Sequence, residues 1–330
     1  MVTREQRGQG QAAGQRRVTR HGLFADVRGD VGHPPLLFLH GGPGQGCYDF
    51  MALQGDRLAA SFLVIGLDQR GVDRSAPLPA GASPTVADVV DDCEELRTAL
   101  GIDHWAVLGH SFGGLFALRY ATTYPAAVSA VVFENPAVDI ALACRAGLTR
   151  AAAVLTRLGQ AEGASAARDA LAADAATRER AGRDERAAAR ALRRAYWAAL
   201  DAIGDERESF FTPDPVTRAR LAQIHAERPE VGTTEDKQAS EDSTHRFHLA
   251  IVKDDAGYDP GLPLLPRLAV PALLITGSQD PVTNDELRAA FRAASPANRL
   301  AGFAQAGHFT HADNPAAYAA TITSFLLPQP

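Results

Sequence analysis

Residues 109–114 read Gly-His-Ser-Phe-Gly-Gly and follow directly after the apolar run 105–108. A serine hydroxyl is a poor nucleophile until a neighbouring base takes its proton. A sharp turn between a strand and a helix lifts the serine hydroxyl clear of the backbone, and it needs very small neighbours, here Gly109 and Gly113. The helix that follows would direct the positive end of its dipole at the hydroxyl. This pattern makes Ser111 a candidate nucleophile, against the alternative of a hydroxyl in a plain glycine turn.

A base and an acid for such a nucleophile are expected further along the chain, each just past a predicted strand. Asp280 follows the apolar run 272–277, and His308 follows a strand predicted near 299–303. The carboxyl ends of parallel strands meet at one edge of a sheet, so both side chains should lie beside Ser111. The chain order serine, acid, histidine is the one that accompanies this kind of turn. His308 is therefore the predicted general base, and Asp280 the acid that orients it.

Alternatives exist for both partners. His311 lies three residues after His308, but it sits at the start of a predicted helical stretch. Glu134 ends a strand in Phe-Glu-Asn-Pro and is the alternative acid, whereas Asp280 could instead be a turn or helix-cap residue. His110, beside the serine, is expected to be a packed neighbour and not a second base. His110 and Glu134 are also candidates for contact with the substrate.

An oxyanion that develops during acyl transfer needs hydrogen-bond donors that are already in place. One donor is expected to be the backbone N–H of Phe112, directly after the serine. The second should come from the loop His-Gly-Gly-Pro-Gly at 40–44, where glycines let the backbone approach the substrate closely. Gly42 is the predicted donor, and Gly41 is the alternative. A phosphate cradle would need a different glycine spacing, which the first strand–helix unit lacks.

Short apolar runs alternate with helical patterns over most of the chain. Runs without polar alternation indicate strands buried on both faces, as in a parallel sheet. Predicted strands cover 18–28, 35–40, 62–68, 105–109, 128–133, 272–277 and 299–303, and predicted helices cover 85–100, 115–124 and 314–327. Thr85 and Asp88 resemble a capping box at the start of the first of these helices, and Gly101 ends it. The alternation predicts a doubly wound α/β fold, with a mostly parallel central sheet and helices on both faces.

The segment 138–260 lacks strand patterns and is rich in helix-forming residues. We expect it to be a helical cap inserted between two strands, covering the mouth of the site and setting substrate size. The core domain would then consist of 18–137 and 261–330. Residues 1–17 are polar, lack the apolar core of a signal peptide, and are predicted to be a disordered tail.

Composition excludes several classes of function. The net charge of −6 and the isoelectric point near 5.9 argue against nucleic-acid and anionic-membrane partners. No apolar run has the length of a membrane span. The three cysteines are too few and too scattered for a disulfide framework or a zinc site, as expected for a cytoplasmic protein. No cofactor or metal is expected, and the partner would be a small-molecule or short-peptide substrate.

The combination of His-Gly-Gly-Pro-Gly at 40–44, Asp-Gln-Arg-Gly at 68–71, the serine turn and the late aspartate and histidine resembles a known family. It is similar to the proline iminopeptidase (prolyl aminopeptidase) branch of the α/β-hydrolase fold, over about 20–138 and 262–328. This resemblance implies a cofactor-independent serine hydrolase that works through an acyl-enzyme. It also implies release of an N-terminal residue, preferably proline, from small peptides or amides.

The chain departs from this family's pattern at several positions. Asp73 replaces a glycine after Asp-Gln-Arg-Gly, and His110 and Phe112 flank the serine where the family has Gly and Trp. The family's cap carries glutamates that bind the substrate's α-amine, one of them in a Trp-x-x-Trp-Glu context. The nearest stretch here surrounds Trp197 and matches poorly, while Glu241 is a candidate replacement for another glutamate. Trp197 and Glu241 are therefore the cap residues that the resemblance offers as substrate contacts.

These departures leave a second interpretation open. The chain could be an esterase, lactonase or amidase that acts on a small molecule, such as a secondary metabolite. A third interpretation, a ligand-binding protein that keeps the fold without turnover, conflicts with the complete set of serine, histidine and acid.

Overall fold

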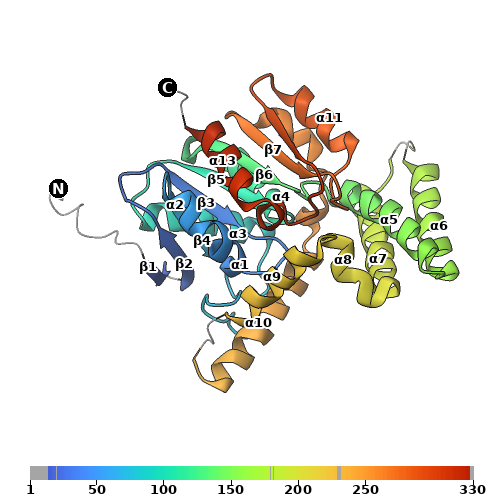
Figure 1. The fold of residues 1–330 in the computed structure, drawn as a ribbon, viewed down its shortest axis with the longest axis horizontal. Helices are drawn as coiled ribbons and strands as arrows, with labels where there is room; N and C mark the ends of the chain where they lie inside the picture. Colours follow the sequence, from blue (N-terminus) through green and yellow to red (C-terminus); the bar gives the residue numbers. More distant parts are fainter. Residues whose placement is uncertain (1–13, 20, 179, 181, 229–231, 328–330) are drawn as a thin grey trace.

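A single eight-stranded sheet runs through the molecule in the order β1-β2-β4-β3-β5-β6-β7-β8 (Figure 1). The computed structural model describes residues 14–327 apart from 20, 179, 181 and 229–231. The strands are β1 (Gly14–Val18), β2 (Leu23–Arg28), β3 (Pro35–Leu39), β4 (Leu63–Asp68), β5 (Trp105–His110), β6 (Val128–Glu134), β7 (Ala272–Gly277) and β8 (Arg299–Phe303). Strands β3 to β8 pair in parallel, and β1 and β2 are antiparallel. The predicted mostly parallel α/β sheet is confirmed.

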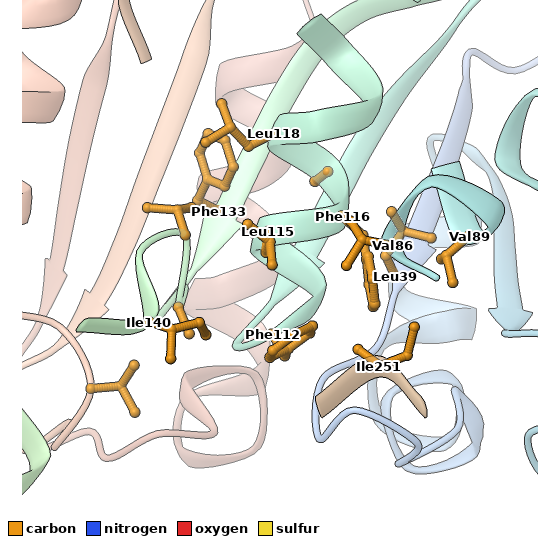
Figure 2. Packing of buried hydrophobic residues seen from close by; sticks show 14 of the residues in the cluster. Leu39, Val86, Val89, Phe112, Leu115, Phe116, Leu118, Phe133, Ile140 and Ile251 are labelled. Atoms are coloured by element: carbon orange, nitrogen blue, oxygen red, sulfur yellow. The ribbon is translucent and has the colours of Figure 1, made fainter. Parts of the chain in front are cut away.

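Helices cover both faces of the sheet, and each face has its own buried apolar cluster. The helices of the core are α1 (Tyr48–Phe50), α2 (Asp56–Ala59), α3 (Val86–Ala99), α4 (Gly113–Thr123), α11 (Asp285–Ala294), α12 (Thr310–Asp313) and α13 (Pro315–Leu326). Helices α3 and α4 belong to one cluster, and α2 and α13 to the other. Figure 2 shows Leu115 and Phe116 of α4 packed between Phe133 of β6 and Val86 of α3. This packing fixes α4, and with it the turn that carries Ser111.

Between β6 and β7 the described residues form helices and no strand. The helices of this insertion are α5 (Ile140–Arg157), α6 (Ala161–Thr177), α7 (Glu185–Ile203), α8 (Arg207–Phe211), α9 (Pro215–Ala226) and α10 (Thr234–Lys253). In Figure 1, α5, α6 and α7 stand together at one side of the sheet, and α9 and α10 run below it. The helices lie within the predicted insertion 138–260, whose boundaries as a separate domain stay a prediction.

The N-terminal region differs from the prediction. Residues 1–13 of the predicted disordered tail lie outside the described residues, but residues 14–17 belong to β1, so disorder is wrong for them. The strand predicted over 18–28 is instead a hairpin of β1 and β2, with Thr19 and Gly22 at positive φ in the turn. Antiparallel pairing with β2 holds this segment through backbone hydrogen bonds along one side of β1, and such bonds do not require apolar side chains.

The first predicted helix is confirmed in detail. Thr85 caps α3, with its side chain accepting from the Asp88 N–H while the Asp88 carboxylate accepts from the Thr85 N–H, and Gly101 follows the helix at positive φ. All three cysteines are buried free thiols. Within the described part of the chain, we find no helix with the length and apolarity that crossing a bilayer requires.

Candidate active site

Ser111 occupies a strained turn between β5 and α4. Its φ is +53°, a left-handed conformation that is uncommon for residues other than glycine and is typical of functional sites. A Cβ atom at Gly109 would collide with the carbonyl group of Gly113, and one at Gly113 would collide with the carbonyl oxygen of Leu39. The backbone N–H of Ser111 donates to the carbonyl of Glu134, 3.0 Å away. The two glycines are thus a steric requirement of the turn, as the sequence pattern indicates.

His308 and Asp280 lie beside this turn, on the loops that follow β8 and β7. His308 Nδ1 is 2.7 Å from Asp280 Oδ1, and both residues are buried. The other carboxylate oxygen, Oδ2, accepts from the N–H and the hydroxyl of Thr283, at 2.7 and 2.6 Å. Nε2 of His308 has no hydrogen-bond partner among the described residues, and His308 lines the same cavity as Ser111. The arrangement leaves Nε2 free to take a proton in that cavity.

Glu134 faces a different histidine. Its Oε1 accepts from the N–H and Nδ1 of His311, at 2.8 and 2.9 Å, and its Oε2 accepts from the hydroxyl of Tyr318 at 2.8 Å. Burial alone would raise the pKa of Glu134, but the charges of His311 and His110 and the hydrogen bonds from His311 lower it to about 2. Glu134 and His311 therefore form a second acid–histidine pair, buried behind the first and outside the cavity.

The second pair belongs to a network that anchors the loop carrying His308. His110 Nε2 donates to the carbonyl of His308 at 3.0 Å, and Asn135 Nδ2 donates to the same oxygen at 2.8 Å. Ligand atoms of His110, Glu134 and His311 lie within 4.8 Å of one another, close enough for a metal ion, but each side chain is hydrogen-bonded within the protein. Substrate contact by His110 or Glu134, which sequence reasoning considered, does not fit, because neither lines the cavity.

The loop proposed for the oxyanion lies against the serine turn. Gly42 and Phe112 both line the cavity beside Ser111. A Cβ atom on Gly41 would lie 2.8 Å from the Cβ of Ser111 and 3.4 Å from the N of Phe112, so no larger residue fits there. Gly41 itself does not line the cavity, and its role is to let the two segments touch. Gly42 has a φ of +108°, which favours glycine as well.

Residues of the motif at 68–71 form hydrogen bonds with the loop at 40–44. Gln69 donates from Nε2 to the carbonyl of His40 at 3.1 Å, and its N–H donates to His40 Nε2 at 3.3 Å. Burial lowers the pKa of His40 to about 4, so the ring is neutral and can accept at Nε2 while Nδ1 donates to the Gly41 carbonyl at 3.0 Å. Asp68 accepts from the Cys47 N–H at 2.7 Å and from Arg74 Nε at 2.7 Å. The motifs at 40–44 and 68–71, which together carry the resemblance to one family, are therefore joined by hydrogen bonds.

A cavity of about 220 Å³ opens above Ser111. Core and insertion both contribute to its wall, which is mostly apolar: Gly42, Pro43, Gln45, Ser111, Phe112, Ala137, Ile140, Ala143, Cys144, Arg193, Tyr196, Trp197, Leu200, Phe211, Val282, His308 and Phe309. Trp197, predicted as a substrate contact, lies in this wall. Among these lining residues, Arg193 is the only Lys, Arg, Asp or Glu, so the cavity presents no carboxylate to an ammonium group.

Glu241 lines a second cavity. That cavity, of about 390 Å³, adjoins the first, because Pro43 and Gln45 line both, and it contains Asp73, Arg228, His245 and His248 as further charged or titratable groups. Glu241 is predicted from the sequence to contact the substrate in place of a family glutamate. The position of the Glu241 side chain, in the second cavity, does not support a contact with a substrate at Ser111. α10, which carries Glu241, packs Phe247 and Ile251 into the core and leaves its acidic face outside.

Sequence reasoning missed Arg193, Asn135 and Phe211. Arg193 had a usable signal, because the lining residues 193, 196, 197 and 200 follow helical periodicity on one face of α7. Asn135 directly follows β6, where polar residues that face a site are expected. Phe211 had no signal, because its contact with the loop of His308 joins segments far apart in the chain.

Comparison with known proteins agrees with this architecture. The family model for the alpha/beta hydrolase fold matches residues 34–315. The proline iminopeptidase of Xanthomonas citri is 43% identical over 116 residues, and that of Xylella fastidiosa (strain 9a5c) is 40% identical over 115 residues. Each alignment covers 35% of this chain and 36% of the relative, so the chain matches about a third of the length of these curated proteins.

Two solved structures illustrate the fold. The proline iminopeptidase-related protein of Thermus thermophilus superposes with a TM-score of 0.68 at 22% identity, covering 95% of this chain and 96% of the other. The esterase RhEst1 of a Rhodococcus species superposes with a TM-score of 0.61 at 20% identity, covering 94% and 97%. At these identities the likeness concerns the fold alone. Because the family model spans most of the sheet and the whole insertion, the chain belongs to the α/β-hydrolase fold family.

Proposed function

We propose that this protein is a serine hydrolase in which Ser111, His308 and Asp280 form the catalytic triad. The observation that carries the proposal is the 2.7 Å contact between His308 Nδ1 and Asp280 Oδ1, next to a cavity that Ser111 and His308 share. An imidazole held at Nδ1 by a carboxylate is fixed in the tautomer that can accept a proton at Nε2. The strained turn at Ser111 supports the same role, because such strain persists where function needs it.

The proposed reaction proceeds in two half-reactions. Ser111 Oγ attacks the substrate carbonyl carbon while its proton passes to Nε2 of His308, and Asp280 stabilises the imidazolium. The N–H groups of Phe112 and Gly42 receive the oxyanion. Collapse of the tetrahedral intermediate breaks the bond to the leaving group, which takes the proton from His308. Water then attacks the acyl-enzyme by the same route and regenerates Ser111.

The test of this proposal is Ser111→Ala, with hydrolysis of p-nitrophenyl esters and labelling by a fluorophosphonate probe as readouts. We expect kcat to fall by about 10³-fold or more and labelling to disappear. The thermal midpoint should change little, because alanine tolerates the turn no worse than serine. Retention of turnover or labelling by this variant would overturn the proposal.

The cavity best suits esters or amides of a small acyl group with an apolar body. Its volume of about 220 Å³ excludes bulky acyl groups, and most of its wall is aliphatic or aromatic. This assignment corresponds to an esterase, lactonase or amidase.

A second candidate is release of an N-terminal residue, preferably proline, from short peptides. It is supported by the curated relatives, which are proline iminopeptidases, and by the motifs at 40–44 and 68–71. A proline side chain would also fit an apolar cavity. Against it stands the absence of a carboxylate among the described residues that line the cavity, since a charged α-amine needs a partner when it leaves water.

Three substrates separate these candidates: proline naphthylamide, its N-blocked form, and a p-nitrophenyl ester of a small acid. An aminopeptidase should cleave only the form with the free amine. An esterase or amidase should cleave the ester and accept the blocked form at least as well as the free one. Ser111→Ala serves as the control for background hydrolysis.

A further inference from the structure

One face of helix α7 forms a wall of the cavity above Ser111. Arg193, Tyr196, Trp197 and Leu200 all line the cavity. Their spacing places them in one stripe along the helix, because residues three, four and seven apart share a face. Three of these residues are aromatic or aliphatic, as expected for a wall that contacts an apolar acyl group. The fourth residue, Arg193, is a cation and needs a separate explanation.

Arg193 and its neighbour Arg194 have no carboxylate partner among the described residues, unlike the other two arginines of α7, and of these two only Arg193 lines the cavity. Arg186 Nε lies 2.6 Å from Oδ1 of Asp259, and Arg190 forms an ion pair with Asp255. Arg193 makes no ion pair and no hydrogen bond with any residue that the structure describes. Its guanidinium instead lies 5.5 Å from the centre of the Trp197 ring. A flat aromatic face orients a guanidinium group without using its N–H donors.

The surroundings of Arg193 leave its charge unneutralised inside the cavity. Neither aspartate nor glutamate occurs among the described residues that line it. Burial raises the pKa of the Cys144 thiol, on the facing helix α5, to about 12, and the charge of Arg193 opposes that rise. The wall thus holds a cation without a counter-ion among the described residues, and an anion in the cavity would find it nearby.

We propose that Arg193 binds a carboxylate carried by the acyl group of the substrate. This inference rests on the proposed hydrolase function and narrows its substrate class to esters or amides of acids with an apolar chain and a second, free carboxylate. A guanidinium fork matches a carboxylate with two parallel hydrogen bonds. One cation in an otherwise apolar wall suits a monoanion better than a phosphate dianion. The acyl group stays in the cavity through both half-reactions, so a fixed charge there holds it until water attacks.

The test uses p-nitrophenyl monoesters of adipic, pimelic and suberic acids, each paired with the diester in which a methyl group caps the free carboxylate. These chains are long enough to avoid the spontaneous anhydride formation of shorter diacid esters. For at least one chain length, the wild-type protein should favour the free carboxylate over its capped form by about tenfold or more in kcat/KM, the factor that about 1.4 kcal/mol of binding supplies. Arg193→Gln should lose most of this preference.

Arg194→Gln is the matched control. Arg194 follows Arg193 on the same helix, is exposed and does not line the cavity, so the same loss of charge there should leave the preference intact. If the wild-type protein shows no preference for the free carboxylate, or if Arg193→Gln retains it, the inference is overturned.

A binding measurement separates this inference from the hydrolase proposal. Ser111→Ala is titrated with monomethyl suberate and with dimethyl suberate, and binding is followed by isothermal titration calorimetry. The carboxylate site is supported if the monoester binds, the diester does not, and the further substitution Arg193→Gln abolishes this binding. That conclusion holds even if the wild-type protein hydrolyses none of the esters, because the lack of hydrolysis would refute only the hydrolase proposal. Binding of neither compound together with no turnover overturns both.

Discussion

The main-chain N–H of His308 donates a hydrogen bond to the carbonyl oxygen of Phe211, 2.8 Å away. Phe211 ends helix α8 of the insertion, and its ring centre lies 5.5 Å from that of His308. The helical insertion therefore does more than cover the cavity, because it also contacts the backbone of the proposed general base. Movement of α8 would be transmitted to the imidazole through this contact.

This contact predicts a specific effect at Gly307. A Cβ atom there would collide with the carbonyl oxygen of Phe211 and approach Cδ of Pro213 to 2.6 Å. Gly307→Ala should therefore push the loop of His308 away from α8 and lower kcat by about tenfold or more, since small misplacements of catalytic groups are costly. The control is Gly302→Ala in β8, where an added Cβ meets nothing within 4 Å. Equal kcat in both variants would contradict the prediction.

Asp280 and Glu134 should separate activity from stability. Asp280→Asn should lower kcat by about 10³- to 10⁴-fold, because the amide no longer holds the imidazole in the reactive form. Glu134→Gln removes the negative charge and one of the two buried oxygens that accept from His311 and from the Tyr318 hydroxyl, so it should lower the free energy of unfolding by about 1 to 3 kcal/mol. Urea denaturation and initial rates on one ester measure both effects. A larger loss of activity in Glu134→Gln than in Asp280→Asn would reverse the assignment of the acid.

The buried histidines predict acid sensitivity. Burial lowers the pKa of His40 to about 4 and that of His110 to about 3, against 6.5 for an exposed imidazole. The unfolded chain takes up these protons near pH 6.5, whereas the folded chain takes them up only at lower pH. Stability present above pH 6.5 is therefore lost as the pH falls from there toward 4 and 3.

The measurement is urea denaturation at about pH 8 and about pH 5, between which this linkage acts. The free energy of unfolding should be smaller at the lower pH, and His110→Gln should show a smaller decrease than the wild-type protein. His104→Gln, at an exposed position, is the control and should show the full decrease. A decrease of the same size in His110→Gln and in the control would refute the role of His110.

The indole of Trp197 should limit the length of the acyl chain. It lines the cavity, and the guanidinium groups of Arg193 and Arg207 lie 5.5 and 4.8 Å from its ring centre. Trp197→Ala should enlarge the cavity and shift the best substrate in a p-nitrophenyl acetate-to-octanoate series toward longer chains. Leu249→Ala, at an exposed position outside the cavity, should leave the order of substrates unchanged. An unchanged order in Trp197→Ala would show that the indole does not bound the acyl site.

Local features of this protein follow from the sequence alone. The turn at Ser111 requires Gly109 and Gly113 for steric reasons, and the cap of α3 needs only Thr85 and Asp88. The cap and the requirement at Gly109 depend on residues a few positions apart, so local contacts set them, whereas the requirement at Gly113 comes from the carbonyl oxygen of Leu39 on the neighbouring strand. The apolar runs similarly predict a parallel sheet, because burial of a strand on both faces leaves a continuous apolar pattern.

Only the tertiary structure decides how distant side chains pair. Two acids and two histidines end at the same edge of the sheet, and the sequence permits either acid to face His308. The structure pairs His308 with Asp280, 28 residues away, and His311 with Glu134, 177 residues away. The same holds for Arg193 in the cavity wall and for Glu241 outside it. Such contacts depend on strand order and on how the inserted helices pack against the core, and no local pattern of residues encodes either.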